Sequence, residues 1–325
     1  MNTITLYYTP KLLALNHYFT MKIITDINKH ASLSPKAIAI GSFDGVHLGH
    51  QAIISELKKI SKTNNLEPYI FFFEPLPKEF FMKENAPLRV YNFRNKVLNI
   101  EKTGIENIIC QNFNQKFANI SAEDFVDFLI KRLKVKHIII GDDFKFGKAR
   151  KGDYELLKKL SVENNFTVDK ISTLNLDNYR VSSTDIRKAF ANHNLETVTE
   201  LLGQAYKVNG RVINGQQNGR KIGFPTANLK LLKNSVLKGV FFTKTYIDGK
   251  SHYGVTNAGT RPTVDGKNNL LETHFFNFSD DIYGKHITVE ILKFIRAEKK
   301  FANFDELKKQ IAKDIQTAKK MIEEL

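Results

Sequence analysis

The hydrophobic pattern of this chain changes its period once, near residue 205, and no other feature limits the possible folds as strongly. Between residue 36 and about residue 172, short apolar runs alternate with amphipathic segments of helical spacing; the runs are 36–40, 69–73, 107–110, 136–141 and 166–171. This alternation predicts a doubly wound parallel sheet with helices between its strands. Ser121, with Asp124 three residues further on, marks the start of one such helix.

After about residue 206 the helical spacing stops, and strand-like runs follow one another with only turn signals between them. The runs are 239–246, 253–257, 271–276 and 286–295. This order predicts an antiparallel barrel. A last helix should begin after Asn303, which has Glu306 three residues on. Its apolar stripe is expected to face the core: Phe304, Leu307, Ile311, Ile315 and Ile322.

The composition limits where the chain works. Its 325 residues, 42% hydrophobic and 26% charged, suit two soluble domains, with a boundary near residue 205. No apolar run approaches the roughly 18 residues of a membrane span, and the N-terminus does not resemble a secretion signal, so no membrane partner is expected. The single cysteine, Cys110, cannot form an internal disulfide. We therefore expect a protein of the reducing cytoplasm in which Cys110 is buried.

The net charge of +15 raises the question of nucleic-acid binding, because basic proteins gain free energy by releasing counterions from phosphates. The excess is spread along the chain, about +6 up to residue 205 and about +9 after it, with acidic residues interleaved throughout. No nucleic-acid partner is expected. The longest basic cluster, residues 145–151, contains Gly147 and is followed by Gly152, and it is predicted to be a phosphate-facing loop.

The segment GSFDGVHLGH, residues 41–50, lies where the first apolar strand should turn into a helix. Asp44-Gly45 should turn the backbone, so that His47 lies at the mouth of the helix and His50 follows on the same face. The first amides of a helix favour an anion. Two imidazole N–H donors beside them could hold nucleotide phosphates while charge builds on a leaving pyrophosphate, and Gly49 leaves room for close approach. A zinc site would need a third ligand, and none is visible nearby.

Several further segments accompany this motif in a fixed order. They are FEPLPKEFF (73–81), APLR (86–89), GDDFKFGKARKGD (141–153), VSSTDIR (181–187), GRVINGQQNGRKIGFPTANL (210–229), NAGTRPT (257–263), ETH (272–274), DIYG (281–284) and IRAEKKF (295–301). The ordered set resembles the prokaryotic bifunctional riboflavin kinase/FMN adenylyltransferases, also called FAD synthetases, from about residue 21 to the C-terminus. The resemblance implies a Rossmann-like nucleotidyltransferase domain over 21–204 and a β-barrel riboflavin kinase domain with a terminal helix over 205–325.

For the first domain, the resemblance implies transfer of AMP from ATP to FMN with release of pyrophosphate, and a set of matching site residues. His47, His50 and Arg187 match catalytic positions, with Arg187 neutralising the pyrophosphate. The matching ATP and phosphate positions are Gly41, Phe43, Gly49, Ser183 and Thr184. Asp143 and Phe144 match positions near the flavin, although Phe144 suits a core position equally well, and Ser183-Thr184 suits an ordinary helix cap.

For the barrel, the resemblance implies phosphorylation of the riboflavin 5′-hydroxyl by ATP with Mg²⁺ as cofactor. Glu272 matches the catalytic base, and Thr226 and Asn228 match the metal ligands, whose oxygens suit Mg²⁺. The glycines of the preceding segment are expected to lie in a loop that is free to wrap phosphates, or could simply form a hairpin: Gly210, Gly215, Gly219 and Gly223. Arg296 and Glu298 match residues on the flavin side.

Two departures and two alternatives accompany this interpretation. Ser42 stands where the family usually has Asn, and Asn214 where His is common; both keep hydrogen-bonding capacity. One domain could be a degenerate partner, although His50 and Glu272 are both intact. The chain could also be a flavin- or RNA-binding regulator that kept the folds without catalysis, which would bind flavin tightly and not turn over ATP.

Residues 1–20 match nothing in the family, whereas Met21-Lys22-Ile23-Ile24 resembles a usual start. The hypothesis is that this extension comes from a misassigned start or is a dispensable tail. A variant that begins at Met21 should therefore fold and keep both activities, as measured by circular dichroism and flavin chromatography. Loss of folding or of either activity would refute the hypothesis.

Overall fold

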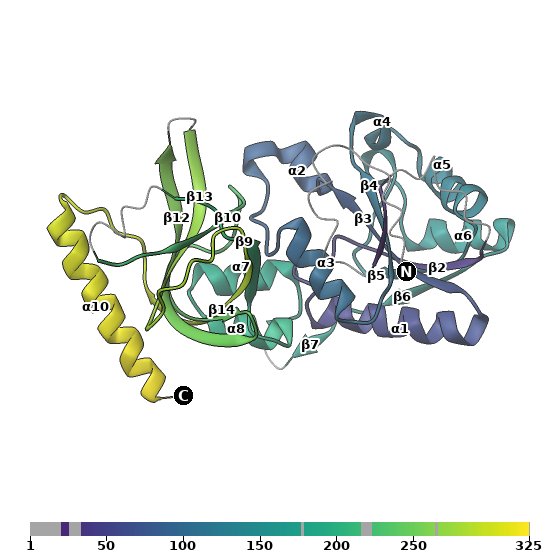
Figure 1. Cartoon of the computed structure of the whole chain (residues 1–325). Coiled ribbons are helices and arrows are strands. Elements are labelled where there is room, and N and C mark those ends of the chain that lie inside the picture. The colour runs from purple at the N-terminus through teal and green to yellow at the C-terminus, as the bar shows by residue number, and fades with distance from the viewer. Residues whose placement is uncertain (1–20, 26–33, 177–178, 216–222, 264–265, 325) are drawn as a thin grey trace. The chain divides into compact units, whose positions relative to one another are not determined.

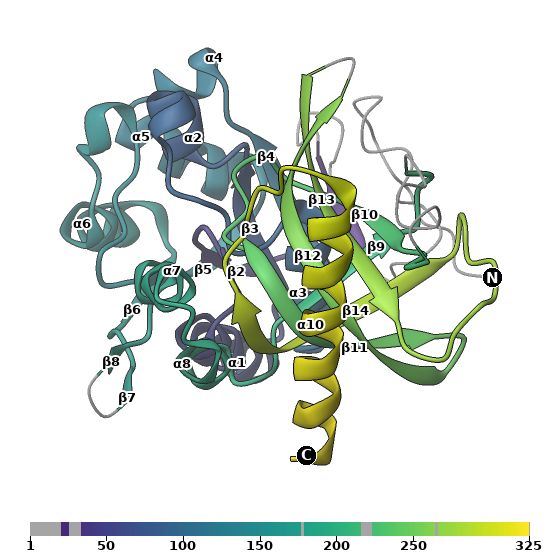
Figure 2. The same ribbon diagram turned by 90° about the vertical axis from the view of Figure 1, so that its left-hand side faces the viewer.

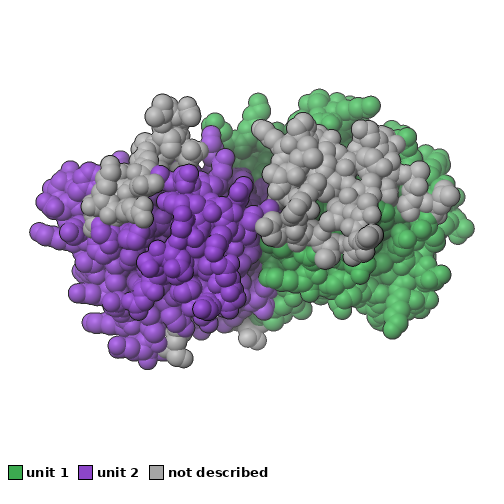
Figure 3. All heavy atoms as spheres, viewed as in Figure 1, with its two compact units in different colours: residues 1–87, 96–182 green, residues 88–95, 183–325 purple. Residues whose placement is uncertain are grey.

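A computed structural model describes residues 21–25, 34–176, 179–215, 223–263 and 266–324. These residues form two compact units, which Figure 3 shows in different colours. The first unit comprises Met1–Pro87 and Lys96–Ser182, and the second comprises Leu88–Asn95 and Ser183–Leu325. The units thus divide at residue 182, earlier than the change of hydrophobic period. The domain boundary near residue 205 stays a prediction.

The first unit contains a six-stranded sheet in which every pairing is parallel. In sheet order, its strands are β1 (Lys22–Ile24), β4 (Asn107–Asn112), β3 (Glu67–Glu74), β2 (Lys36–Ile40), β5 (Val135–Gly141) and β6 (Thr167–Ile171). This confirms the predicted parallel sheet and adds β1 at its edge. The chain builds outwards from β2 through β3 to β4, then returns to the other side of β2 with β5. The sheet therefore has its topological switch point beside β2, where ligands of such folds bind.

Helices connect these strands, as the sequence pattern predicts (Figure 1). They are α1 (Leu48–Asn64), α2 (Pro77–Met82), η3 (Lys83–Asn85), α3 (Phe93–Glu101), α4 (Gln115–Ala118), α5 (Ala122–Asp127), η4 (Phe128–Arg132), η5 (Lys148–Arg150) and α6 (Tyr154–Asn164). A short hairpin, β7 (Asn175–Leu176) and β8 (Tyr179–Arg180), follows β6. The Ser121 side chain accepts a hydrogen bond from Asp124 N, which confirms the predicted start of α5.

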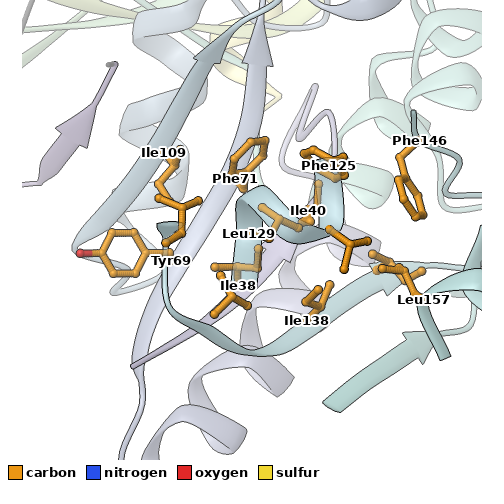
Figure 4. Close-up of a cluster of buried hydrophobic side chains, with 14 of the residues drawn as sticks. Ile38, Ile40, Tyr69, Phe71, Ile109, Phe125, Leu129, Ile138, Phe146 and Leu157 are labelled. Carbon is orange, nitrogen blue, oxygen red and sulfur yellow. The ribbon is translucent and has the colours of Figure 1, made fainter. Parts of the chain in front are cut away.

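The core of the first unit explains why β2 lies at the centre of the sheet. All five of its residues are buried, as expected for a strand covered on both faces. On one face, Ile38 and Ile40 join a cluster with Phe71, Phe125 and Leu129 (Figure 4). The predicted burial of the only cysteine is also confirmed, since Cys110 on β4 is 4% exposed. A rigid apolar platform therefore supports the turn that follows β2.

The second unit contains a six-stranded sheet in which every pairing is antiparallel. In sheet order, its strands are β10 (Ala227–Leu231), β13 (Gly266–Phe275), β12 (Lys250–Thr263), β11 (Gly239–Ile247), β14 (His286–Arg296) and β9 (Lys207–Arg211). Just after β9, Ile213 N donates to Asn228 O in β10 at 2.9 Å, so the two edges of the sheet meet. This confirms the predicted barrel. Two helices precede it, α7 (Ser183–Ala191) and α8 (Leu195–Leu202).

Residues 88–95, which lie far upstream of the barrel in sequence, belong to the second unit. Arg89 N donates to Asn234 O at 2.7 Å, and Val236 N donates to Arg89 O at 3.1 Å. The Tyr91 and Tyr206 rings stack with centroids 4.9 Å apart, and the Tyr206 hydroxyl donates to Val90 O at 2.6 Å. Hydrophobic periodicity does not predict that residues 88–95 join the second unit, because the contacts are made by backbone groups and by a pair of aromatic rings.

The last helix, α10 (Phe304–Glu323), lies along the barrel (Figure 2). Asn303 caps it by accepting from Glu306 N at 2.9 Å, as predicted. Ile315 and Ile322 pack against a buried apolar cluster that contains Phe242 and Val255. Phe304, however, is 60% exposed, so its assignment to the core was wrong. The fully buried residues of α10 are Asp314 and Ala318, so the buried face of the helix is centred on them and does not include Phe304.

Asp314 anchors α10 to the end of β14. Its carboxylate, with a side chain 4% exposed, accepts from Arg296 Nε at 2.9 Å and from Arg296 Nη2 at 2.7 Å. Gln310 Nε2 adds a third donor at 2.8 Å. Removing one partner of such a pair leaves a buried charge without compensation.

We expect Asp314→Ala to destabilise the docking of α10 by about 3–5 kcal/mol, because the Arg296 guanidinium would lose its carboxylate. Hydrogen exchange of the α10 amides, together with urea unfolding, would measure the loss. Glu324→Ala is the matched control: it removes an exposed pair with Lys293 at 2.8 Å, worth at most about 1 kcal/mol. Equal effects of the two substitutions would contradict this account.

Candidate active sites

The two histidines of the GSFDGVHLGH segment lie together at the end of β2, at the switch point of the sheet. Their rings stack with centroids 3.7 Å apart and planes inclined by 20°. The Phe43 ring lies 5.0 Å from that of His50 and is fully buried. The expectation that His47 and His50 share a face at the mouth of α1 is confirmed.

His47 is also the N-cap of α1, which determines its tautomer. Its Nδ1 accepts from His50 N at 3.3 Å, so a neutral His47 ring carries its proton on Nε2. Only one ring nitrogen of His47 can therefore act as a donor to a ligand. His47 takes the capping role that Ser, Thr, Asp or Asn usually fills.

His50 is held in its neutral form. Burial lowers its pKa well below 6.5, and the neighbouring His47 and Lys96 add to this effect. Its Nδ1 is buried and has no hydrogen-bond partner among the described residues. A neutral imidazole carries one N–H group, which can donate a hydrogen bond to a phosphate oxygen without adding a charge to the site.

Lys96 is a buried cation near this pair that nothing in the sequence pattern singles out. Its side chain is fully buried, with Nζ 3.8 Å from Glu74 Oε2 and 4.4 Å from the centroid of the Phe72 ring. The adjacent polar asparagine and arginine residues make this stretch look like an exposed helix start. Only the tertiary structure places Lys96 inside the first unit.

The backbone of the turn between β2 and α1 is unusual. Gly45 has φ 96°, as Asp44-Gly45 predicts, but Phe43 and Val46 also have positive φ, 48° and 46°. Such a conformation is rare for a β-branched residue and is typical of functional sites. A Cβ on Gly49 would lie 3.2 Å from His47 Nδ1 and 3.3 Å from Val181 O. Because Gly49 has no side chain, the backbone at residue 49 can lie close to the His47 ring and to the Val181 carbonyl.

Gly41 and the flavin-side residues lie on the same unit. A Cβ on Gly41 would lie 3.2 Å from the Phe43 ring. Asp143 is exposed, with its side chain 83% accessible and 3.9 Å from Arg180. Phe144 is half-buried and stacks on Phe146 at 5.7 Å, so it is partly a core residue, one of the two possibilities that the sequence leaves open.

A group of aromatic side chains from β3, α2 and the segment after β4 was not assigned from the sequence. Phe113 lies within 5.7 Å, centroid to centroid, of three rings: Phe73, Phe80 and Phe81. Phe81 is 63% exposed, so the group offers an apolar face to solvent. The FEPLPKEFF motif was the available signal. Flat aromatic surfaces of this kind suit a planar ligand.

Ser183, Thr184 and Arg187 lie on α7, in the second unit. Ser183 is the first residue of the helix and Thr184 is exposed, which confirms the expected pair of hydroxyls at a helix start. Arg187 lies one turn later, and its Nε donates to Leu88 O. The guanidinium is thus fixed in direction by the backbone of residues 88–95.

In the barrel, three polar residues form a row across neighbouring strands. Asn228 of β10 pairs directly with Glu272 of β13, which in turn pairs with Asn257 of β12. Residues directly opposite each other in an antiparallel sheet point to the same face. Along β13, Leu271, Thr273 and Phe275 are buried while Glu272 is half-exposed. Alternation thus places the row on the outer face of the barrel.

Asn228 is the buried end of this row. It is 4% exposed, and its Oδ1 has no hydrogen-bond partner among the described residues. A Cβ on Gly215 would clash with the Asn228 amide, so this glycine allows the close approach. Thr226 is half-buried one residue before β10. A buried amide oxygen without a partner indicates a position where a hard cation could bind.

The remaining glycines of the barrel segment have different surroundings. Gly210 lies within β9, opposite Ile287, so the expectation that it belongs to a loop was wrong; the ladder to β14 extends further than the glycine pattern suggests. Gly223 has φ 87°, and a Cβ there would have no atom of the described residues within 4 Å. Gly219 lies outside the described residues.

Arg296 and Glu298 occupy the end of β14 and the segment after it. The Arg296 guanidinium is engaged by Asp314, and its Nη1 donates to Ala297 O at 2.9 Å. A Cβ on Gly259 would overlap the Glu298 carboxylate, so Glu298 lies directly over β12. Arg296 therefore fixes the path of the segment that carries Glu298. Among the described residues, no group of three His, Cys, Asp or Glu side chains could hold a metal.

Comparison with known proteins identifies the family of this chain. A family model described as FAD synthetase matches residues 29–185, and one described as riboflavin kinase matches residues 202–322. The bifunctional riboflavin kinase/FMN adenylyltransferase of Haemophilus influenzae is 43% identical over 295 residues, 90% of this chain and 96% of the relative. The chain belongs to this family. It is an enzyme of FAD synthesis that phosphorylates riboflavin to FMN and adenylylates FMN to FAD.

Other proteins match this bifunctional enzyme over a similar share of its length. The protein of the same name from Escherichia coli K12 is 41% identical over 305 residues, 92% of this chain and 97% of the relative. A crystal structure titled as a macrolide-efflux protein from Streptococcus pneumoniae aligns with a TM-score of 0.76 and 28% identity, covering 93% of this chain and 99% of that one. Within the described part of the enzyme, no helix is long and apolar enough to cross a membrane.

The lowered pKa of His50 gives a test of the buried pair. Above pH 6.5 the imidazole is neutral in both the folded and the unfolded enzyme, so its contribution to stability is fully present there. As the pH falls below 6.5, the unfolded chain takes up a proton that folded His50 resists, and stability is lost towards the lower folded pKa. The free energy of unfolding should therefore fall less between pH 7 and pH 5 in His50→Gln than in the wild type.

Urea unfolding of the first unit at a series of pH values would measure this difference. His193→Gln, which removes an exposed imidazole in the second unit, is the matched control. Parallel pH profiles for the wild type and His50→Gln would show that His50 is not held neutral.

Proposed function

We propose that adenylyl transfer takes place at the His47–His50 pair and that riboflavin phosphorylation takes place at Glu272 in the polar row of the barrel. The observation that supports this division is that the histidine pair lies in the first compact unit and the polar row of Glu272 lies in the second. The two family models, which match residues 29–185 and 202–322, support domains of 21–204 and 205–325 for the two activities, although α7 and α8 belong to the compact unit of the barrel.

In adenylyl transfer, an oxygen of the FMN phosphate attacks the α-phosphorus of ATP, and the bond to the β-phosphate breaks to release pyrophosphate. His47 Nε2–H and the neutral His50 ring donate to phosphate oxygens as negative charge develops, together with the first amides of α1. Gly41, Phe43 and Gly49 shape this turn around the phosphates. Because the donors are fixed by stacking and burial, little reorganisation accompanies the reaction.

The remaining first-reaction residues keep the roles that the family implies. Ser183 and Thr184 would bind phosphate at the start of α7, and Arg187 would neutralise the pyrophosphate, aided by the fixed direction of its guanidinium. Asp143 and Phe144 would lie at the flavin, with Phe144 offering only the part of its ring that Phe146 leaves exposed.

In the kinase reaction, the Glu272 carboxylate accepts the proton of the riboflavin 5′-hydroxyl, whose oxygen attacks the γ-phosphorus of ATP, and ADP leaves. Mg²⁺, when bound, would neutralise charge on the phosphates. Asn228 Oδ1 and the Thr226 hydroxyl would hold it, and the buried Asn228 oxygen, without a partner among the described residues, fits that role. Gly210, Gly219 and Gly223 would border the phosphates.

On the flavin side of the barrel, Glu298 would contact riboflavin, and Arg296 would support it by fixing the intervening backbone. The substrates proposed for the whole enzyme are riboflavin, FMN and ATP. A cytoplasmic location is supported by the single buried cysteine, and the absence of a nucleic-acid partner by the spread of charge along the chain.

Two substitutions should separate the activities. His50→Ala should lower FAD formation from FMN by about 10²–10³-fold and leave FMN formation unchanged, since it removes one preorganised donor. Glu272→Ala should lower FMN formation from riboflavin by about 10²–10⁴-fold and leave FAD formation unchanged.

Both variants would be incubated with ATP and Mg²⁺, once with riboflavin and once with FMN, and the flavins separated by chromatography over time. The wild type should show FMN first and FAD after it. If either substitution abolished both activities while the fold remained intact, the assignment of one reaction to each site would be wrong.

A further inference from the structure

His274 lies two residues after Glu272 on β13, and it is the part of the ETH motif to which the proposed mechanism gives no task. Its Nδ1 lies 2.9 Å from Pro225 O. A carbonyl oxygen can only accept, so His274 Nδ1 carries the proton and donates it. The bond joins the strand that bears Glu272 to the residue immediately before Thr226.

This bond begins where the strand pairing ends. The ladder between β10 and β13 runs from Leu231↔Asn269 to Ala227↔Thr273. Thr226 lies one residue beyond that last pair, outside the ladder. The His274 side chain therefore takes over from the backbone and fixes the Pro225–Thr226 peptide, and with it the origin of the Thr226 side chain.

Two aromatic rings hold the imidazole in this orientation. The Phe224 ring meets it edge to face, with centroids 5.4 Å apart and planes at 89°, and the Phe276 ring lies 6.3 Å away at 67°. Phe224 directly precedes Pro225, so packing and hydrogen bond act on the same short segment. His274 is half-buried, which limits competition from water for the Pro225 carbonyl.

We propose that His274 is a positioning residue for the kinase reaction, which holds Thr226 in the orientation that binds the magnesium–nucleotide complex. This inference rests on the proposed role of Thr226 and Asn228. His274 itself touches neither the phosphates nor the reacting hydroxyl. Hydrogen-bond partners that orient metal ligands typically contribute about 10–100-fold to affinity or activity.

Two substitutions separate the hydrogen bond from the packing. His274→Phe keeps a ring between Phe224 and Phe276 but removes the donor, whereas His274→Asn places an amide N–H near the position of Nδ1. Binding of Mg·ADP, measured by calorimetry, should weaken about 10–100-fold in His274→Phe and stay within about threefold of the wild type in His274→Asn. The KM for Mg·ATP in the kinase reaction should follow the same order.

Three controls keep the outcome specific. FAD formation from FMN should be unchanged in both variants, and circular dichroism should show that the barrel is still folded. His252→Phe alters a histidine on β12 that contacts Phe278 at 4.8 Å, and it should change nothing. Asn228→Ala should weaken Mg·ADP binding, since it removes a proposed ligand.

Each contrary result has its own meaning. If Asn228→Ala weakens Mg·ADP binding but His274→Phe does not, or if His274→Asn is as impaired as His274→Phe, the positioning role of His274 is overturned. If Asn228→Ala leaves binding unchanged, the proposed metal site falls and the inference falls with it. Nitrogen-15 NMR of the wild type adds a test that needs no variant: an unprotonated His274 Nδ1 would also overturn the proposal.

Discussion

The burial of β2 on both faces is the constraint on which the candidate site at His47 and His50 depends. A central parallel strand has neighbours on both sides, and all five residues of β2 are buried between β3 and β5. Its end is therefore fixed, and so is the turn that follows. That rigidity allows the turn to keep positive φ at Phe43 and Val46, which a mobile loop would relax. His47 and His50 are held together at the switch point because the strand before them cannot move.

The second site depends on a different property of β structure, the alternation of side chains. Thr273 points into the barrel, where its hydroxyl is hydrogen-bonded to that of Thr256 at 2.9 Å. Its neighbours Glu272 and His274 must then point outwards. The antiparallel register then places Asn228 and Asn257 on either side of Glu272. A shift of one residue would turn the whole set inwards.

The sequence interpretation was incomplete where a polar side chain has a partner that hydrophobic spacing does not reveal. Arg296 matched a flavin-side position, yet its guanidinium is occupied by Asp314 from the last helix. Lys96, which the sequence interpretation did not single out, is a buried cation close enough to lower the pKa of His50. His47 was expected to donate, and one of its nitrogens accepts from His50 N as a helix cap. Periodicity reports which faces are apolar and carries no information on such pairings.

The sequence by itself determined the parallel sheet, the barrel, and the capped starts of α5 and α10, because local spacing encodes them. The tertiary structure alone decided that residues 88–95 join the second unit and that the buried face of α10 includes Asp314 and not Phe304. It also decided that the His274 side chain is hydrogen-bonded to the Pro225 carbonyl. These features depend on contacts between residues distant in sequence. A spacing rule cannot anticipate them, since each is fixed only when the core has placed both partners.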